Sequence, residues 1–366
     1  MREDGGRTLK RILVAGFSTR HVALSAHRAG YEVFAVDHFC DADLRKNTIS
    51  CMKFEELADL PVLIRKMCDT FDIDAIIPTS GAETLDNLPA LILGTDPHTA
   101  GQFLNKDFVQ NWFSSLNIPV PPLLEPGEFP AMLKPVSGSG GWRNMVVRSP
   151  DDIKAWKEAF PGEPFLLQKI VPGIPASVCC VAGCGRARAL AVNRQILRDE
   201  GAYQFGFAGS LTPFDHPMQE KMISCAERAA AASGCLGILG IDFMVSDDEI
   251  YAIELNPRFV ATLDTIEAAT GINLVKIHLD TFHGILPESM PVPVQYAIRR
   301  ILFADRACAV TDDLSFLSPG VADIPVLPAL FEDGNAIISV YGTGQNAALA
   351  QEALDTTIMV VKQYIQ

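Results

Sequence analysis

The stretch of sequence that decides the fold is GIDFMVSDDEIYAIELN, residues 240–256. Two runs with the alternating pattern of β-strands flank a polar turn at residues 246–249, which predicts a hairpin centred on Asp248. In this register Asp242 lies opposite Glu254, and Asn256 follows on the same face because strand side chains alternate with a period of two. We expect the other face to be buried, since it carries Ile241, Phe243, Ile253 and Leu255.

The three polar residues on this hairpin face have the chemistry of a magnesium site. Carboxylates that face each other across two strands repel, so Asp242 and Glu254 add no stability unless a cation joins them. Two carboxylates and the amide oxygen of Asn256 are hard ligands that suit Mg²⁺, with Mn²⁺ as an alternative ion. From these residues alone, a solvated acidic face explains the pattern equally well.

A loop rich in glycine and serine follows the strand-like run Leu133-Lys134-Pro135. It consists of Ser137, Gly138, Ser139, Gly140 and Gly141. The backbone N–H groups of such a loop can approach phosphate oxygens closely because glycine has no Cβ. The loop is not a Walker A motif, since GxxxxGK[ST] is absent here, and a flexible surface loop is the alternative interpretation.

The beginning of the chain predicts a doubly wound parallel α/β domain over residues 1–100. Apolar strand patterns at residues 11–16, 31–37 and 75–78 alternate with helical patterns. A domain of short strands and glycine loops is expected over residues 101–290, and a small α+β lobe over residues 291–366. The motif G-x-G-x-x-G is missing, which argues against NAD binding although Asp37 ends the second strand.

Composition excludes several classes of partner. The chain has 366 residues, with 30 Lys and Arg against 44 Asp and Glu, for a net charge of −14. This acidic balance argues against nucleic acid and against an anionic membrane surface. No uncharged apolar run approaches the roughly 18 residues that a membrane span needs. At about 150 residues per domain, the length predicts two to three domains.

The cysteines predict a reducing environment. The nine cysteines are an odd number, are scattered through apolar segments and include no CxxC pair. We therefore expect reduced, buried thiols rather than a metal site or disulfides, in a cytoplasmic protein. The charged N-terminus is unlike a secretory signal peptide.

Taken in order, these features resemble the ATP-grasp superfamily of carboxylate-activating ligases. The most specific part is Gly240-Ile241-Asp242-Phe243, then Glu254-Leu255-Asn256-Pro257-Arg258, then Gly271-Ile272-Asn273-Leu274-Val275. The likeness covers about residues 10–285. It implies an ATP-grasp domain of two lobes after the N-terminal domain, with a small C-terminal lobe.

The resemblance also implies roles for individual residues. Asp242, Glu254 and Asn256 would hold the Mg²⁺ ions that bridge the phosphates of ATP, and Arg258 would steady the acyl phosphate or the γ-phosphate. Lys106 and Lys134 would contact ATP, and residues 137–141 would cover its phosphates. Three residues of the hinge strand would contact adenine, namely Gln168, Lys169 and Val171.

The activity that the resemblance implies is ligation of a small-molecule carboxylate to an amine through an acyl phosphate, with release of ADP. In the biotin carboxylase branch a glutamate follows the motif arginine by four residues, and here that position is Thr262. This difference argues against the first alternative, a bicarbonate-using carboxylase. The second alternative is a nucleotide-binding protein without turnover, and the intact set of motif residues argues against it.

A narrower likeness is to stand-alone archaeal-type ATP-grasp proteins such as tyramine–glutamate ligase, and it involves the run Val192-Asn193-Arg194-Gln195. In this interpretation Arg194 binds phosphate or a substrate carboxylate, while a surface arginine is the alternative. His21, Arg20 and residues 80–83 are possible substrate contacts. The sequence names neither the acid nor the amine, and a homodimer is possible.

Overall fold

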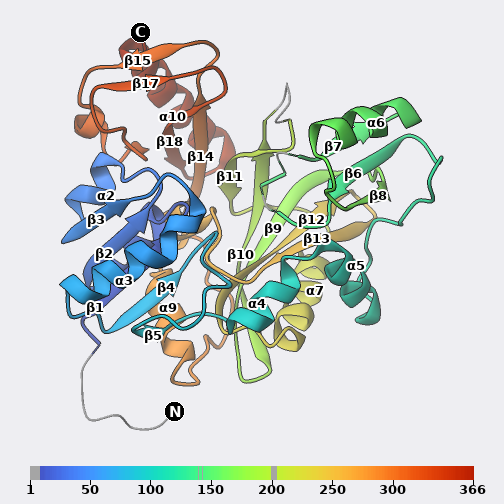
Figure 1. Ribbon diagram of the computed structural model, residues 1–366, viewed down its shortest axis with the longest axis horizontal. Coiled ribbons are helices and arrows are strands. Elements are labelled where there is room, and N and C mark those ends of the chain that lie inside the picture. Colours follow the sequence, from blue (N-terminus) through green and yellow to red (C-terminus); the bar gives the residue numbers. More distant parts are fainter. Residues whose placement is uncertain (1–8, 139, 142, 199–203) are drawn as a thin grey trace.

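The computed structural model describes residues 9–138, 140–141, 143–198 and 204–366. Figure 1 shows the N-terminal sheet with its helices, a large sheet through the middle, and the C-terminal lobe next to the N-terminal domain. Among the described residues, no helix is long and apolar enough to cross a membrane.

The N-terminal domain is a five-stranded parallel sheet in the order β3-β2-β1-β4-β5. This confirms the predicted doubly wound parallel domain. Its strands are β1 (Arg11–Gly16), β2 (Glu32–Asp37), β3 (Ser50–Lys53), β4 (Ala75–Pro78) and β5 (Leu91–Ile92). Its helices are α1 (Arg20–Arg28), α2 (Ala42–Lys46), the 3₁₀ helix η1 (Leu57–Asp59) and α3 (Leu60–Thr70).

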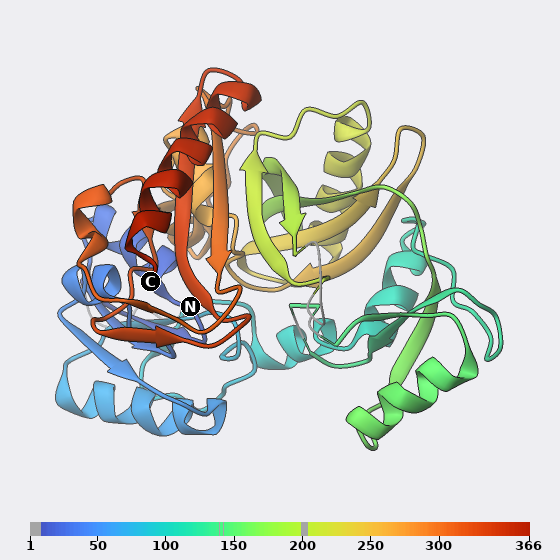
Figure 2. The ribbon, with the colours of Figure 1, turned by 90° about the horizontal axis from the view of Figure 1, so that it is seen from above.

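Two short helices lead out of this domain, and a small antiparallel sheet follows them. The helices are α4 (Pro97–Phe103) and α5 (Lys106–Ser115). The sheet has the order β7-β6-β8, with strands β6 (Ala131–Pro135), β7 (Met145–Val147) and β8 (Phe165–Lys169), and is packed against α6 (Pro150–Ala159). In Figure 2 this lobe stands to one side of the main body.

The largest element is an eight-stranded sheet in the order β13-β12-β9-β10-β11-β14-β18-β16. Its strands are β9 (Ile174–Gly183), β10 (Arg186–Leu197), β11 (Phe207–Thr212), β12 (Gly237–Val245), β13 (Ile250–Asn256), β14 (Tyr296–Phe303), β16 (Val321–Ala322) and β18 (Ala336–Gly344). The helices that follow its strands are α7 (Gln219–Ala232), α8 (Leu263–Thr270), α9 (Leu274–Thr281) and α10 (Ala347–Val361).

The C-terminal lobe shares this large sheet and adds a two-stranded antiparallel sheet of its own, formed by β15 (Cys308–Val310) and β17 (Ala329–Phe331). Strand β14 pairs with β11 of the central domain, so the sheet runs across the expected boundary near residue 291. The lobe also contains the 3₁₀ helices η3 (Leu314–Leu317) and η4 (Lys362–Tyr364). This continuity fixes the lobe beside the N-terminal domain.

A shared hydrophobic core joins the N-terminal domain to the large sheet. Apolar residues of α1 pack in one cluster with residues of β9, α8 and α9, including Val22, Val181, Ile266 and Leu274. Burial of contiguous apolar surface in this way holds domains in a fixed relation. The cavity described below lies where these parts meet.

The expectation of wholly reduced cysteines is wrong for one pair. Cys40 and Cys51 form a disulfide, whereas the other seven cysteines are free. Cys40 lies in the turn after β2, and Cys51 lies on β3, which pairs in parallel with β2. The two thiols meet only because this parallel pairing brings the strands together, and no cysteine spacing in the sequence indicates it.

Candidate active site

The hairpin of β12 and β13 brings the three predicted magnesium ligands to one face. Asp242 pairs with Glu254, as the sequence predicts, and Gly240 pairs with Asn256. The register shifts by one residue between Asp242 and Phe243, which leaves Ile253 as the extra residue of a bulge. Ile253 lines the cavity instead of filling the buried face, so its predicted position was wrong.

The carboxylate of Asp242 is held by two amides. Gln195 Nε2 donates to its Oδ1 at 2.8 Å, and Asn256 Nδ2 donates to its Oδ2 at 3.2 Å. Burial, together with the negative charge of Glu254, raises the pKa of Asp242 to about 7. Glu254 itself makes no hydrogen bond or ion pair with any described residue, so its oxygens are open to a ligand.

These residues fit a hard cation. Within the described ranges, no three His, Cys, Asp or Glu side chains gather as a metal cluster. The hairpin instead offers two carboxylates and one amide, all through oxygen. Such a set suits a Mg²⁺ that completes its octahedron with water and phosphate oxygens.

Two lysines face the same cavity. Lys134 lies on β6 and Lys106 begins α5, and both line the cavity wall. Burial lowers the pKa of Lys134 to about 8; Glu254 opposes this shift and the neighbouring Lys106 adds to it. Lys134 has no hydrogen bond or ion pair within the described part of the chain, and Lys106 donates to the carbonyl of Gly138. Two neighbouring cations of this kind suit a polyanion.

The predicted phosphate loop lies partly in the cavity wall. Gly140 and Gly141 line the cavity, with positive φ angles of 76° and 70°. A Cβ on Gly141 would come within 2.5 Å of the carbonyl oxygen of Phe205, so this approach requires glycine. Ser137 and Gly138 do not line the cavity, and Ser139 lies outside the described residues.

An apolar slot adjoins the lysines. The predicted hinge residues Gln168, Lys169 and Val171 line it, together with the side chains of Met132 and Phe243. Gln168 Nε2 donates to Gln110 Oε1 at 2.6 Å, while Gln168 Oε1 is buried and accepts no hydrogen bond from any described residue. A buried acceptor in an apolar slot suits a flat ligand with an amino group, such as a purine.

Arg258 lies between the hairpin and the N-terminal domain. Its guanidinium donates to Asn256 Oδ1 at 2.6 Å, and its Nε lies 2.8 Å from Glu83 Oε1. Thr262, which follows on the same segment, lines the cavity, and its buried hydroxyl has no partner among the described residues. No pattern in the sequence indicates the contact of Glu83 with Arg258, because 175 residues separate them.

The structure does not bring Arg194 to the site. Arg194 is exposed and does not line the cavity, whereas its neighbour Gln195 points into it and binds Asp242. Successive side chains of a strand point to opposite faces, so only one of the two can face the cavity. The sequence interpretation of this run missed Gln195, whose side chain lines the cavity and donates to Asp242.

These residues line one continuous cavity of about 660 Å³. Its wall includes residues of the N-terminal domain, of the three-stranded and eight-stranded sheets, and of the C-terminal lobe. From the N-terminal domain come Phe17, Ser18, His21, Phe39, Asp41, Thr79 and Ser80, and from the C-terminal lobe Arg299, Ile301, Asp323, Pro325, Phe331 and Ser339. This volume lies within the range of about 300–1,000 Å³ that is usual for small-molecule binding sites.

Comparison with known proteins agrees with this geometry. Residues 104–262 match the sequence model of a family described as an ATP-grasp domain. A Methanocaldococcus jannaschii protein, described as uncharacterized, is 28% identical over 364 aligned residues, which cover 92% of this chain and 88% of that protein.

Solved structures share the fold. The biotin carboxylase domain of Hydrogenobacter thermophilus 2-oxoglutarate carboxylase, solved as a dimer with MgADP and bicarbonate, has a TM-score of 0.79 at 15% identity over 97% of this chain and 90% of its own. Phosphoribosylamine–glycine ligase of Thermotoga maritima has a TM-score of 0.75 at 16% identity over 97% of each chain. Pyruvate carboxylase of Rhizobium etli has a TM-score of 0.76 at 18% identity over 96% of this chain, which spans only 37% of that enzyme.

Proposed function

Because the chain contains an ATP-grasp domain, we propose that the protein is an ATP-dependent, ADP-forming ligase that joins a small-molecule carboxylate to an amine. One observation carries the proposal. The open carboxylate of Glu254 faces Asp242 on one side of the cavity, and the two lysines Lys106 and Lys134 line the same cavity. A metal–nucleotide complex requires carboxylates that bind the cation and, beside them, ammonium groups that bind the phosphates.

In this proposal ATP lies between the small sheet and the large sheet. The purine occupies the slot lined by Gln168, Lys169 and Val171, and the phosphates reach Lys134, Lys106 and the backbone of residues 140–141. Asp242, Glu254 and Asn256 would hold Mg²⁺, which when bound offsets the negative charge of the phosphates. Enclosure by apolar walls excludes water and strengthens these interactions.

The chemical problem is that a carboxylate is a poor electrophile. In the first step a carboxylate oxygen attacks the γ-phosphorus, the bond from this phosphorus to the bridging oxygen breaks, and ADP leaves. Arg258, oriented by Glu83 and Asn256, would neutralise charge on the transferring group. In the second step the amine nitrogen attacks the acyl carbon and gives up a proton, and phosphate leaves. The residues act by positioning and charge, without a covalent enzyme intermediate.

The experiment is to measure ADP release from ATP and Mg²⁺ with pooled carboxylates, each with and without pooled amines or bicarbonate. We expect ADP only when one acid and one amine are both present. Glu254→Gln should lower the rate about 10²-fold or more, because the variant removes a carboxylate that would hold the Mg²⁺ at the phosphates. Glu249→Gln is the matched control, since Glu249 lies on the same hairpin but is exposed and outside the cavity.

The other outcomes separate the alternatives. Bicarbonate-dependent ADP release would identify a carboxylase instead. Binding of MgATP without ADP release from any pool would favour a nucleotide-binding protein without turnover. ADP release that survives Glu254→Gln would contradict the proposed metal site.

A further inference from the structure

Asp41, in the cavity wall, carries a carboxylate that nothing else in the described structure engages. Asp41 precedes α2 at the N-cap position, where an aspartate ordinarily accepts a hydrogen bond from the first turn of the helix. Here its side chain makes no such bond, and it forms no hydrogen bond or ion pair with any described residue. It lines the cavity instead.

The segment that carries Asp41 is held in place from several directions. Asp37 Oδ1 accepts from the backbone N–H groups of Phe39 and Cys40 at 2.7 Å each, and Arg45 Nε donates to the carbonyl of Cys40 at 2.7 Å. The disulfide from Cys40 to Cys51 ties the same turn to β3. The backbone that carries Asp41 is therefore held in place before any ligand arrives, which lowers the entropic cost of binding.

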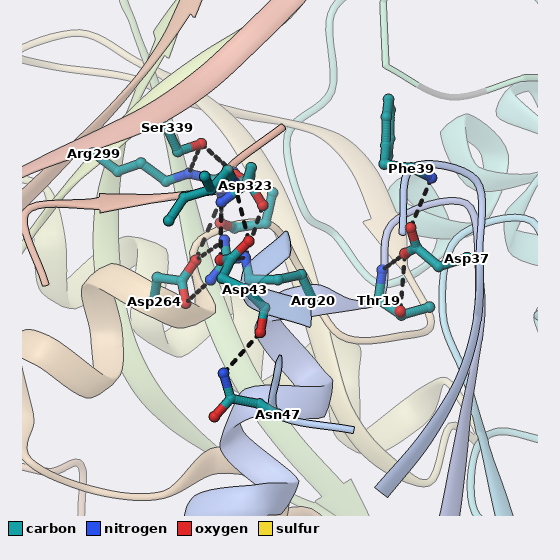
Figure 3. A network of polar contacts seen from close by, with 12 residues as sticks. Thr19, Arg20, Asp37, Phe39, Asp43, Asn47, Asp264, Arg299, Asp323 and Ser339 are labelled. Carbon is teal, nitrogen blue, oxygen red and sulfur yellow. Dashed lines mark hydrogen bonds and ion pairs between the residues drawn. The ribbon is translucent and has the colours of Figure 1, made fainter. Parts of the chain in front are cut away.

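The charges around Asp41 are mainly negative. Burial, and after it the negative charges of Asp323, Asp43 and Asp37, raise its pKa to about 9 against the smaller opposing effect of Arg20, so an ionised Asp41 at pH 7 requires a cation beside it. Arg20 is already engaged, because its guanidinium binds Asp264 and Asp323 at 2.7 Å each, as Figure 3 shows. The described part of the chain thus gives Asp41 negative neighbours and no ion pair with a cation.

The acids next to Asp41 have partners, which distinguishes them from it. Asp43 accepts from the backbone N–H groups of Asp323 and Ile324 at 3.1 and 3.0 Å. Asp37 accepts from Thr19 and from its own turn. Asp323 binds both Arg20 and Arg299. Asp41 is the acid of this group whose partner must come from outside the described residues.

A second polar group near this wall also has no partner. His21 is only 7% exposed and lines the cavity, yet its ring makes no hydrogen bond to any described residue. The same cavity is lined by apolar groups as well: Phe17 and Phe39 are 40% and 41% exposed and in contact with each other, and Pro325 and Phe331 contribute from the C-terminal lobe. Polar groups without partners beside exposed aromatic rings indicate a site for a ligand with both kinds of surface.

We propose that Asp41, His21, Phe17 and Phe39 form a substrate subsite for a protonated amino group on an apolar body. The role of this subsite in catalysis rests on the proposed ligase function. A carboxylate stabilises the protonated form of an amine, whereas a nucleophilic nitrogen must be unprotonated. The bound ammonium is therefore not the reacting amine, and the substrate class is a small molecule that keeps one positive charge while another of its groups reacts.

The structure disfavours other occupants. An anion would meet the negative charges around Asp41, and a neutral alcohol would bring no positive charge to stabilise the ionised form of Asp41. The ion pairs of Arg20 and Arg299 occupy the cationic groups that could have bound a carboxylate here. Three ligands of the same shape that differ only in charge, one positive, one neutral and one negative, should therefore bind with different affinities.

The experiment compares three probes that share one carbon skeleton: benzylamine, benzyl alcohol and benzoate. Dissociation constants are measured by calorimetry or ligand-observed NMR on the full chain at pH 7, without ATP turnover. We expect benzylamine to bind wild-type protein about tenfold more tightly than benzyl alcohol, and benzoate to bind more weakly than both. Asp41→Asn should weaken benzylamine about tenfold and leave benzyl alcohol unchanged.

Two variants serve as controls. Asp86→Asn removes the same charge from an exposed position of the same domain and should leave all three affinities unchanged. Phe39→Ala should weaken benzylamine and benzyl alcohol together, which tests the apolar wall without altering Asp41. Unaltered MgADP affinity and circular dichroism in each variant show that the fold is intact.

Equal binding of benzylamine and benzyl alcohol would overturn the proposal, as would preference for benzoate or a benzylamine affinity that Asp41→Asn does not change. These measurements need no ligase activity. Failure of the ADP-release experiment with a positive result here would reject the ligase and keep the cation subsite. The reverse pattern would keep the ligase and reject the subsite.

Discussion

Arg258 shows how a single residue of the site depends on a distant part of the chain. Its Nε pairs with Glu83 at 2.8 Å, and both side chains are largely buried. Glu83 is held in turn, because its Oε2 accepts from the backbone N–H of Gly81 at 2.6 Å. The sequence interpretation considered Glu83 only as a substrate contact, and the structure gives it contact with the motif arginine.

The first prediction concerns this ion pair. Glu83→Gln keeps an acceptor of similar shape but removes the charge that orients Arg258, so we expect kcat to fall about tenfold while MgADP affinity stays the same. Steady-state kinetics measure kcat, and calorimetry measures the affinity for MgADP. Glu56→Gln, an exposed residue of the same domain, is the control. A parallel loss of nucleotide affinity would mean that Glu83 acts on the fold and not on Arg258.

His278 is a buried histidine whose hydrogen bonds require one neutral tautomer. Its Nδ1 accepts from the backbone N–H of Ile238 at 3.0 Å, and its Nε2 lies 3.0 Å from the carbonyl oxygen of Leu93. Nε2 therefore carries the proton. Burial lowers the pKa of His278 to about 4, and protonation of Nδ1 would break the bond to Ile238.

This arrangement predicts acid sensitivity. The pKa of His278 is lower in the folded state than its ordinary value of about 6.5, so the unfolded state binds more protons between these pH values. The stabilisation is complete above pH 6.5 and is lost as pH falls toward 4. At pH 5 the free energy of unfolding is therefore lower by about 2 kcal/mol. Urea unfolding measures the free energy of unfolding of wild type and of His278→Gln. The difference between the two should narrow by this amount from pH 7 to pH 5. A constant difference would contradict a neutral, buried His278.

At the scale of elements, the hairpin of β12 and β13 depends on its bulge. Near the turn, Val245 pairs with Ile250, and this register alone would set Asp242 opposite Ile253. The extra residue Ile253 moves Glu254 into that place. The predicted pairing of Asp242 with Glu254 is thus confirmed. The regular alternation of side chains between the two faces, on which the prediction rested, is interrupted at Ile253.

Gly240 on β12 leaves room for the segment that carries Arg258 and Thr262. A Cβ at Gly240 would lie 2.3 Å from Cγ1 of Val260. No positive φ constrains Gly240, so space is the reason for glycine at this position. The segment after β13 can pack on the hairpin only because this side chain is missing.

Gly240→Ala should therefore destabilise the protein by about 1–3 kcal/mol through overpacking. Val260→Ala removes the methyl group that collides, so the double variant should recover part of the loss. A double-mutant cycle by urea unfolding measures the coupling. Additive effects of the two changes would show that the methyl group is not the obstacle.

At the scale of the whole molecule, Arg20 joins three parts of the chain. It lies on α1 of the N-terminal domain, is 3% exposed, and pairs with Asp264 on α8 and with Asp323 of the C-terminal lobe, as drawn in Figure 3. Arg299 on β14 binds Asp323 from the other side at 2.8 Å. Because the charges are buried, each must keep its partner.

Asp264→Ala should lower the free energy of unfolding by about 3–5 kcal/mol, since it leaves Arg20 buried with less negative charge beside it. The double variant Arg20→Met with Asp264→Leu replaces the ion pair by apolar groups. It should lower the free energy of unfolding by less than Asp264→Ala does. Urea unfolding measures both. If the double variant is as unstable as the single one, the loss comes from packing rather than from an unpaired charge.

Much of the site could be predicted from the sequence because it depends on local patterns. Strand alternation fixes which side chains share a face, so the common face of Asp242, Glu254 and Asn256 follows from residues 240–256 alone. The placement of Lys134 ahead of a glycine loop is equally local. The parallel N-terminal sheet follows from the repeated order of strand and helix.

Other features were decided only by tertiary structure. Gln195 rather than Arg194 faces the cavity, Glu83 reaches Arg258, and Cys40 meets Cys51, because the register of strands and the packing of domains set these contacts. The same holds for Asp41, which has no hydrogen-bond or ion-pair partner among the described residues, a fact visible only once its neighbours are in place. A local pattern specifies the direction in which a side chain points, whereas its partners come from segments far along the chain, and only the folded arrangement brings them together.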